Sequence, residues 1–291
     1  MKQLIAGYGF VGEEVSKLFP KADVYDPVKI DYTVFDHTVF DHTVFGHTVF
    51  DHTYYYDPPT EHYDICHCCV PTPMKEDGSC DVSAVEDVIE KIDAEIFIVR
   101  STVPPGTCHR LECEAGKRDF EKWFDGGKKG RQKDTWVVMQ PEYVASSSPY
   151  PAPLSDMKTR DFVILGGRPE ITKKVRKLYE TVYPPTVRIC EVDSKTAEII
   201  KYAENAFIAT KVTFCNEVHG ICQLFKADYD QVREGVFRLD PRMTEWWTYC
   251  EGKGWGGHCL PKDMASLVSF SGSDFFADVI KHNRRHRNEG S

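Results

Sequence analysis

The chain has 291 residues, 41% of them hydrophobic and 28% charged, which is typical of a globular protein with one large or two medium domains. Its net charge of -9 argues against a nucleic-acid-binding protein, because such proteins usually carry a basic face. Apolar runs fall short of the roughly 20 residues of a membrane span, and the first residues lack the regions of a signal peptide. The eleven cysteines are an odd and scattered set, so we expect reduced thiols in a cytoplasmic protein.

The N-terminal residues have the pattern of a dinucleotide-binding β-α-β unit. An apolar strand over residues 2–6 runs into a GxGxxG turn, a helix begins near residue 11, and a second strand over residues 22–25 ends at an aspartate. The three glycines make the bend, let the backbone approach a pyrophosphate and let the helix pack on the strand. The acid would bind the adenosine ribose and repel a 2′-phosphate, which favours NAD over NADP. A turn without a ligand is the alternative. The cofactor residues assigned here are Gly7, Tyr8, Gly9, Phe10, Val11, Gly12 and Asp26.

A tandem repeat of five residues follows over positions 31–55, with histidines at positions 37, 42, 47 and 52. A period of five matches neither a strand nor a helix. Because the copies share one spacing, we expect duplication of a short coding segment that forms an inserted surface loop or irregular hairpin. One turn of a pentapeptide β-helix would bury too little to stand alone, and metal binding by the histidines is a further alternative.

Strands and helices alternate from residue 63 to about residue 192, which predicts a Rossmann-type doubly wound α/β domain over residues 1–192. The run of Cys66, His67, Cys68 and Cys69 has the wrong spacing for a structural zinc site, so we expect a core strand there. Strands are expected over residues 63–70, 96–99, 135–139, 161–165 and 187–190, and helices over residues 84–92 and 169–183, with a polar helix and loop over residues 113–133.

The remaining residues, 193–291, have a helical pattern, with a long helix over residues 195–224 and a helix over residues 275–286. A glycine-rich loop is expected around Cys259. The last helix ends in a basic cluster that suits cations at a helix C-terminus, and phosphate binding is the alternative. The cluster consists of Lys281, Arg284, Arg285 and Arg287. We therefore predict a second, all-helical domain with a long central helix.

Five residues of this second domain have the types that covalent catalysis needs. Lys201 and Asn205 are four residues apart and share one face of the long helix. Cys259 follows glycines that let a backbone approach a substrate, and Lys262 and Asp263 come shortly after it. A thiol beside a cation is a better nucleophile. On these residues alone, a solvated polar stripe and an inert cysteine remain the alternatives, and no metal is required.

Seven motifs occur in an order that is typical of one enzyme family: GYGFVG, CVPTP, STVPPGT, PEY, AEIIKYAENAF, LDPRM and GWGGHCLPKD. The chain resembles the UDP-glucose/GDP-mannose dehydrogenase family over its whole length apart from the repeat and residues 113–134. The resemblance implies that two NAD⁺ oxidise the primary alcohol of a nucleotide sugar, preferably UDP-glucose, to a carboxylate. It also implies a homodimer built on the long helix that begins near Lys195.

The same resemblance implies a role for each matching residue. Cys259 would capture the aldehyde intermediate as a thiohemiacetal, and a second oxidation would give a thioester that water hydrolyses. Lys201 and Asn205 would stabilise negative charge on the sugar oxygen, while Asp263 and Glu142 would handle protons and water. The implied cofactor contacts at the ends of later strands and beside the thiol are Val70, Pro71, Thr72, Ser101, Thr102 and Lys262, with Thr102 also ordering the water. The implied substrate contacts are Glu142, Tyr143, Lys201, Asn205, Arg242, Trp255 and Gly256, with Arg242 reaching the neighbouring subunit.

The sequence departs from the family pattern in two places. Ser146 stands where the family motif Pro-Glu-Phe-Leu-x-Glu-Gly has its second glutamate, so one anchor for cofactor and substrate is expected to be missing. Family members also usually carry a third, C-terminal α/β domain that closes over the nucleotide, and we expect half of that pocket to be absent. The alternative function is therefore a catalytically weak NAD- or nucleotide-sugar-binding protein that needs a partner chain.

Overall fold

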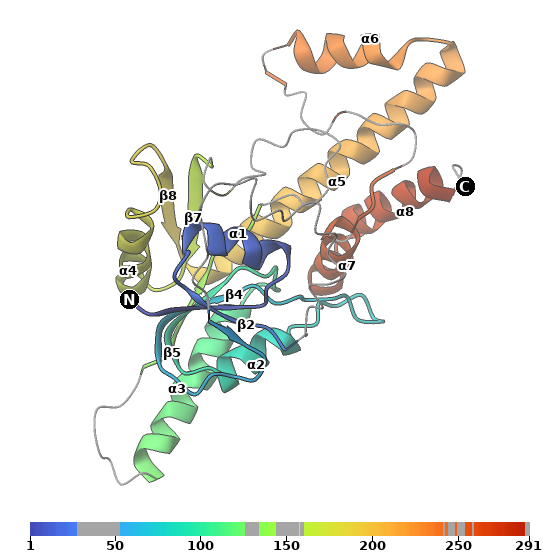
Figure 1. Cartoon of the computed structure of the whole chain (residues 1–291). Coiled ribbons are helices and arrows are strands. Elements are labelled where there is room, and N and C mark those ends of the chain that lie inside the picture. Colours follow the sequence, from blue (N-terminus) through green and yellow to red (C-terminus); the bar gives the residue numbers. More distant parts are fainter. Residues whose placement is uncertain are drawn as a thin grey trace. The chain divides into compact units, whose positions relative to one another are not determined.

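The computed structural model divides the chain into two compact units (Figure 1). The first, here called the sheet unit, comprises Met1–Thr72 and Val82–Glu198, and the second, the helical unit, comprises Pro73–Asp81 and Ile199–Ser291. The predicted domain boundary after residue 192 stays a prediction. The residues that the structure describes are 1–27, 53–125, 134–143, 157, 160–240, 242–243, 248, 254–257 and 259–288.

The sheet unit contains an eight-stranded sheet, within the described residues, with the strand order β3-β2-β1-β4-β5-β6-β7-β8. Neighbouring strands run parallel except β6 and β7, which are antiparallel. The first six strands have the order 3-2-1-4-5-6 of a Rossmann sheet, which places its switch point between β1 and β4. The strands are β1 (Gln3–Ala6), β2 (Asp23–Tyr25), β3 (Tyr54–Tyr55), β4 (Tyr63–Cys68), β5 (Ala94–Val99), β6 (Trp136–Met139), β7 (Phe162–Gly166) and β8 (Arg188–Val192).

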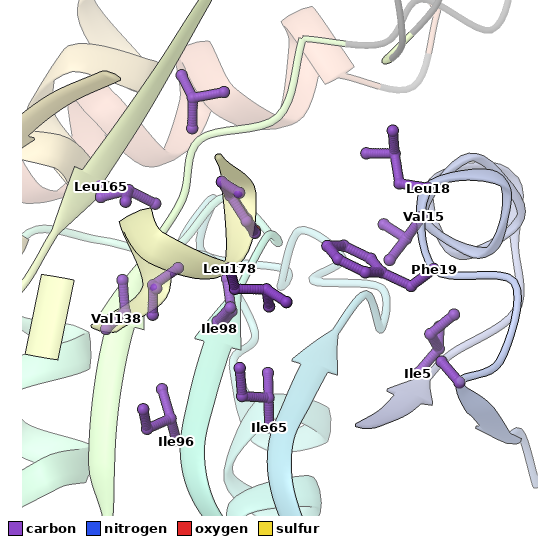
Figure 2. Packing of buried hydrophobic residues seen from close by; sticks show 14 of the residues in the cluster. Ile5, Val15, Leu18, Phe19, Ile65, Ile96, Ile98, Val138, Leu165 and Leu178 are labelled. Atoms are coloured by element: carbon purple, nitrogen blue, oxygen red, sulfur yellow. The ribbon is translucent and has the colours of Figure 1, made fainter. Parts of the chain in front are cut away.

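The core of the sheet unit forms on central parallel strands that are covered on both faces and are therefore mostly apolar. Ile65, Ile96 and Ile98 of the central strands are at most 4% exposed, and Val15 of the first helix packs into the same cluster (Figure 2). The helices of this unit are α1 (Phe10–Leu18), α2 (Ser83–Lys91), α3 (Thr107–Asp125) and α4 (Pro169–Tyr179). The predicted α/β class with a doubly wound sheet is confirmed.

The helical unit is organised around one long helix, as expected. Its core joins Tyr202 and Ala206 of that helix to Trp255, Met264 and Val279. Within the described residues, no helix has both the length and the apolar character that a bilayer crossing requires. The helices are α5 (Ser194–Phe225), α6 (Tyr229–Arg233), the π-helical turn η1 (Glu234–Arg238), α7 (Cys259–Ser271) and α8 (Asp274–Asn288).

The structure differs from the prediction at Cys259 and has a short strand at the end of the repeat. Cys259, expected in a loop, instead begins α7. Pro261 does not prevent this start, because the first-turn N–H groups of a helix have no partner inside it, and the buried Met264 and Leu267 supply an apolar face. The repeat lies mostly outside the described residues, but its last residues form β3, which pairs with β2 through Val24 and Tyr54.

Candidate functional site

The turn after β1 has the geometry of a phosphate-binding turn. Gly7 has a φ of 89°, and a β-carbon there would lie 2.9 Å from the backbone carbonyl of Cys69. A β-carbon at Gly12 would lie 2.1 Å from the carbonyl oxygen of Gly7, so the fold itself requires both glycines. A β-carbon at Gly9 would meet nothing within 4 Å. Packing therefore does not require a glycine at position 9, and the space beside it at the start of α1 is open, as the predicted approach of a pyrophosphate would need.

Asp26 lies at the end of β2 and is held against this turn. Its Oδ2 accepts a hydrogen bond of 2.7 Å from the backbone N–H of Tyr8. The ring of Tyr8 meets that of Tyr54 edge-on at 5.6 Å, and Phe10 and Val11 open the helix that follows. The turn, the helix start and the acid thus have the arrangement that is typical of dinucleotide-binding Rossmann folds, and the individual contacts to the cofactor stay predictions.

The loops after β4 and β5 are joined by two hydrogen bonds. Thr72 Oγ1 donates to the carbonyl oxygen of Thr102 at 2.9 Å, and Ser101 Oγ donates to that of Val70 at 2.5 Å. Pro71 lies between the two bonded residues of the β4 loop. Because β4 neighbours β1 at the switch point, these predicted cofactor residues follow the strands beside the glycine turn.

Glu142, which follows β6, is held by two buried arginines. Arg100 Nη1 donates to its Oε2 at 2.8 Å, and Arg160 Nη2 donates to its Oε1 at 2.5 Å. The side chain of Arg100 is 0% exposed, that of Arg160 is 1% exposed and that of Glu142 is 5% exposed. Burial raises the pKa of Glu142, but the attraction of Arg160 and Arg100 outweighs burial and lowers the pKa below its ordinary value. Glu142 is therefore a carboxylate at neutral pH, and the predicted substrate residue Tyr143 follows it.

A second polar cluster lies wholly within the helical unit. Asn205 Nδ2 donates to Oδ2 of the buried Asp263 at 2.5 Å. Lys262 Nζ lies 2.9 Å from Asp263 Oδ1, which is an ion-pair distance without the geometry of a hydrogen bond. Lys201 lies one turn before Asn205 on α5 and is half-buried. The structure thus brings Asn205, Lys262 and Asp263 into contact, and their predicted roles stay predictions.

Cys259 is exposed at the first residue of α7, in the same helix as Lys262 and Asp263. The thiol of Cys259 is therefore accessible from solvent, unlike the buried cysteines of β4. The N-terminus of a helix carries a partial positive charge, which stabilises negative charge that develops beside it.

The loop before Cys259 is fixed by hydrogen bonds to Trp255. The backbone N–H of Trp255 donates to Asn283 Oδ1 at 2.7 Å, and Asn283 Nδ2 donates back to its carbonyl oxygen at 3.0 Å. The indole Nε1 donates to Thr213 Oγ1 at 2.8 Å. Trp255 is 6% exposed, so its side chain anchors the loop, and its role as a substrate contact stays a prediction together with that of Gly256.

Arg242 is an exposed residue that is bonded to a neighbouring aspartate. Its side chain is 84% exposed, and its Nε and Nη2 donate to the carboxylate of Asp240 at 2.9 and 2.6 Å. Ser146, the departure noted in the PEY motif, lies outside the described residues.

Sequence reasoning missed four residues that shape these sites. Arg100 could have been noticed, because it is a charged residue that directly follows the apolar run of residues 96–99. The sequence contains no such indication for Arg160, Thr213 or Asn283. Their partners are distant in sequence, and only the fold reveals the contacts.

The expected core strand at Cys66 and Cys68 is confirmed, since both side chains are buried in β4 and burial raises the pKa of each thiol. The ten cysteines in the described residues are free. Across those same ranges, no cluster of histidine, cysteine and acidic side chains has the arrangement of a metal site. The four repeat histidines lie outside them.

Two family models match the chain. The NAD binding domain of the UDP-glucose/GDP-mannose dehydrogenase family matches residues 38–185, and the central domain of that family matches residues 195–288. The match to an NAD binding domain and the geometry of the glycine turn agree on the cofactor, which is NAD.

Curated relatives of the chain are named UDP-glucose 6-dehydrogenases. The chain is 33% identical to a UDP-glucose 6-dehydrogenase of Pseudomonas aeruginosa over 70% of its own length and 44% of that protein. It is 30% identical to the UDP-glucose 6-dehydrogenase YwqF of Bacillus subtilis over 77% of its own length and 49% of that protein. The chain therefore spans less than half the length of each of these relatives.

Solved structures share the fold. A UDP-glucose dehydrogenase from Pyrobaculum islandicum superposes with a TM-score of 0.74 at 22% identity, covering 99% of this chain and 68% of that one. A UDP-D-ManNAc dehydrogenase from Pyrococcus horikoshii has the same TM-score and identity, covering 98% of this chain and 69% of that one.

Proposed function

The chain belongs to the UDP-glucose/GDP-mannose dehydrogenase family, and on that premise we propose that it oxidises the primary alcohol of a nucleotide sugar to a uronic acid with NAD. UDP-glucose is the preferred substrate in this proposal, because the curated relatives named above are UDP-glucose 6-dehydrogenases. The observation that carries the proposal is the exposed Cys259 at the start of α7, because the same helix carries Lys262 and Asp263, and Asp263 is hydrogen-bonded to Asn205 of α5.

NAD, when bound, accepts two electrons and a hydrogen from the sugar carbon in each of two successive oxidations. After the first, the thiolate of Cys259 forms a C–S bond to the aldehyde carbon and retains it as a thiohemiacetal. After the second, the same carbon is a thioester. Water then attacks that carbon, the C–S bond breaks, and the carboxylate leaves as the thiol is restored. The covalent bond explains how the aldehyde stays in place between the two oxidations.

Polar side chains of the helical unit supply charge and proton transfer in this proposal. The ammonium of Lys201 and the amide of Asn205 stabilise the oxyanion that forms when sulfur adds to the aldehyde. Asp263 exchanges protons with the sugar hydroxyl and with the hydrolytic water. In the sheet unit, Glu142 and Thr102 have the role of holding water by hydrogen bonds in this proposal. An ionised Glu142 accepts such bonds but has no proton to donate.

We propose that two copies pair along α5. Three apolar side chains seven residues apart remain largely exposed on this helix: Phe207 at 68%, Phe214 at 55% and Ile221 at 56%. A seven-residue apolar repeat is the spacing that packs one helix against another, and exposed apolar patches of this kind mark association surfaces. The exposed Arg242 would then reach the substrate of the neighbouring copy.

Turnover with a panel of UDP- and GDP-sugars and NAD⁺ tests the proposal. The expected result is two NADH for each sugar consumed, with UDP-glucose the best substrate. Cys259→Ser should abolish acid formation while NAD⁺ binding is retained, and full turnover by this variant would refute the covalent route. If wild-type protein binds NAD⁺ and UDP-sugars but yields no NADH, the alternative of a binding protein that needs a partner chain replaces the enzyme.

A further inference from the structure

Glu198, in the second turn of α5, is a buried carboxylate of the sheet unit that has no predicted contact with cofactor or substrate. It is 0% exposed, and both of its oxygens accept hydrogen bonds from backbone N–H groups, Oε2 from Gly106 at 2.5 Å and Oε1 from Cys108 at 2.8 Å. These N–H groups lie at the start of α3, where a helix provides no acceptor of its own. A carboxylate suits this position, because it accepts through two oxygens and its charge complements the positive end of the helix.

Glu198 fixes one end of the loop of residues 101–106, which leads from β5 to α3. The other end is tied to the loop after β4 by the hydrogen bonds of Ser101 and Thr102 described above. Two consecutive prolines lie between these ends, and their rings restrict the backbone angle φ. The loop is therefore short, stiff and held at both ends, so that a shift of Gly106 is passed on to Thr102.

Gly106 has a backbone conformation that other residues rarely adopt. Its φ is 95°, and a β-carbon there would meet no atom of the described structure within 4 Å. The glycine is therefore required by the path of the backbone at the contact with Glu198, and not by crowding. A substitution at this position perturbs the contact without creating a clash.

From these contacts we propose that Glu198 is a positioning residue for NAD, which holds the start of α3 so that Ser101 and Thr102 stand where the cofactor binds. It acts through the backbone of Gly106 and Cys108 and needs no contact of its own with NAD. This role rests on the proposed function, because the cofactor contacts of Ser101 and Thr102 are part of the same predicted site. By linkage, NAD bound to this loop must in turn strengthen the contact that Glu198 makes.

Isothermal titration of the full chain with NAD⁺ tests this role without turnover. Glu198→Gln should weaken NAD⁺ binding at least about fivefold, because an amide has one acceptor oxygen and turns an N–H group toward the second backbone donor. Gly106→Ala perturbs the same contact from its other partner, since an L-residue is strained at a φ of 95°, and it should weaken NAD⁺ binding as well. Hydrogen exchange should rise in residues 101–110 of both variants and stay unchanged in β4.

The matched control is Glu112→Gln. Glu112 is also a buried carboxylate of the sheet unit, 8% exposed, and it accepts from the backbone N–H of Val137 at 3.2 Å and from Arg168 Nε at 2.6 Å. Its substitution should lower the urea midpoint of unfolding, as Glu198→Gln does, but leave NAD⁺ affinity unchanged, because these contacts do not involve the loop of residues 101–106. The pair thus separates positioning of the cofactor loop from a general loss of stability.

The outcomes distinguish this role from the proposed function. A loss of NAD⁺ affinity in Glu198→Gln and Gly106→Ala, but not in Glu112→Gln, supports the role even if no panel sugar is oxidised, in which case only the proposed activity fails. Wild-type affinity in Glu198→Gln or in Gly106→Ala overturns the role even if the wild type forms NADH, and so does an equal loss in Glu112→Gln. If Glu198→Gln does not fold, Gly106→Ala alone decides. Wild-type protein that binds no NAD⁺ at millimolar concentration also overturns the role.

Discussion

Replacing Glu142 by glutamine tests whether the buried Arg100–Glu142–Arg160 group stabilises the sheet unit. The substitution keeps the shape but removes the only carboxylate that the described structure places against these two guanidinium groups, whose side chains are 0% and 1% exposed. Removing one partner of a buried ion pair costs about 3–5 kcal/mol, because the remaining charge is left uncompensated. With a urea dependence of about 3 kcal/mol per molar, the unfolding midpoint should fall by about 1–1.7 M.

Urea unfolding followed by circular dichroism at two pH values checks both the size and the cause of this effect. The folded-state pKa of Glu142 lies below its ordinary value of 4.5. Its contribution to the free energy of unfolding is therefore fully present above about pH 4.5 and is lost as the pH falls through the lower folded pKa. Wild type should lose this contribution on acidification, and Glu142→Gln should not. The matched control is Glu86→Gln, whose exposed ion pair with Arg110 should contribute less than about 1 kcal/mol. A midpoint for Glu142→Gln within about 0.3 M of wild type would refute the reasoning.

Three further perturbations follow from single contacts. Gly7→Ala should weaken NAD⁺ binding at least tenfold in titration, because its φ of 89° and the 2.9 Å approach to Cys69 force the turn to move; unchanged affinity would show that the turn tolerates a side chain. Glu198→Ala should lower the free energy of unfolding by about 1–3 kcal/mol, because Glu198 accepts from the backbone N–H groups of Gly106 and Cys108 at the start of α3; a urea midpoint equal to wild type would contradict this. Phe214→Glu should convert a dimer into a monomer in light scattering after size exclusion, since it places a charge in the α5 stripe; a variant that stays dimeric would place the interface elsewhere.

The sequence was informative where function depends on residues close together along the chain. The glycine turn was predictable because strand, turn, helix and acid follow one another within a single β-α-β unit. Asn205 and Asp263 are far apart in sequence, yet each belongs to a short motif whose family resemblance implied one site. The helical start at Cys259 was missed because Gly256, Gly257 and a proline two residues after the cysteine favour a loop locally, and tertiary burial of Met264 and Leu267 overrides them.

Other features could not be predicted because their physical cause lies in contacts between distant segments. The ionisation of Glu142 depends on Arg160 and Arg100. Arg160 follows a segment without a recognisable motif, and the strand pattern alone would place Arg100 in a loop. The anchoring of Trp255 depends on Thr213 and Asn283 from two different helices. No periodicity relates such residues, so only the packing of the elements reveals them.

The environments of the two predicted catalytic carboxylates argue for different roles. Glu142 is bound through both oxygens by buried guanidinium groups that stay charged at any accessible pH, so giving it a proton would leave two cations facing one another. Asp263 shares one oxygen with a neutral amide and has the other 2.9 Å from an ammonium group outside hydrogen-bond geometry. Asp263 therefore keeps an oxygen with hydrogen-bonding capacity for a proton or a water molecule, and it lies in the same helix as the thiol whose adduct must be hydrolysed. Proton transfer in the proposed reaction belongs with Asp263, whereas Glu142 acts through its fixed charge.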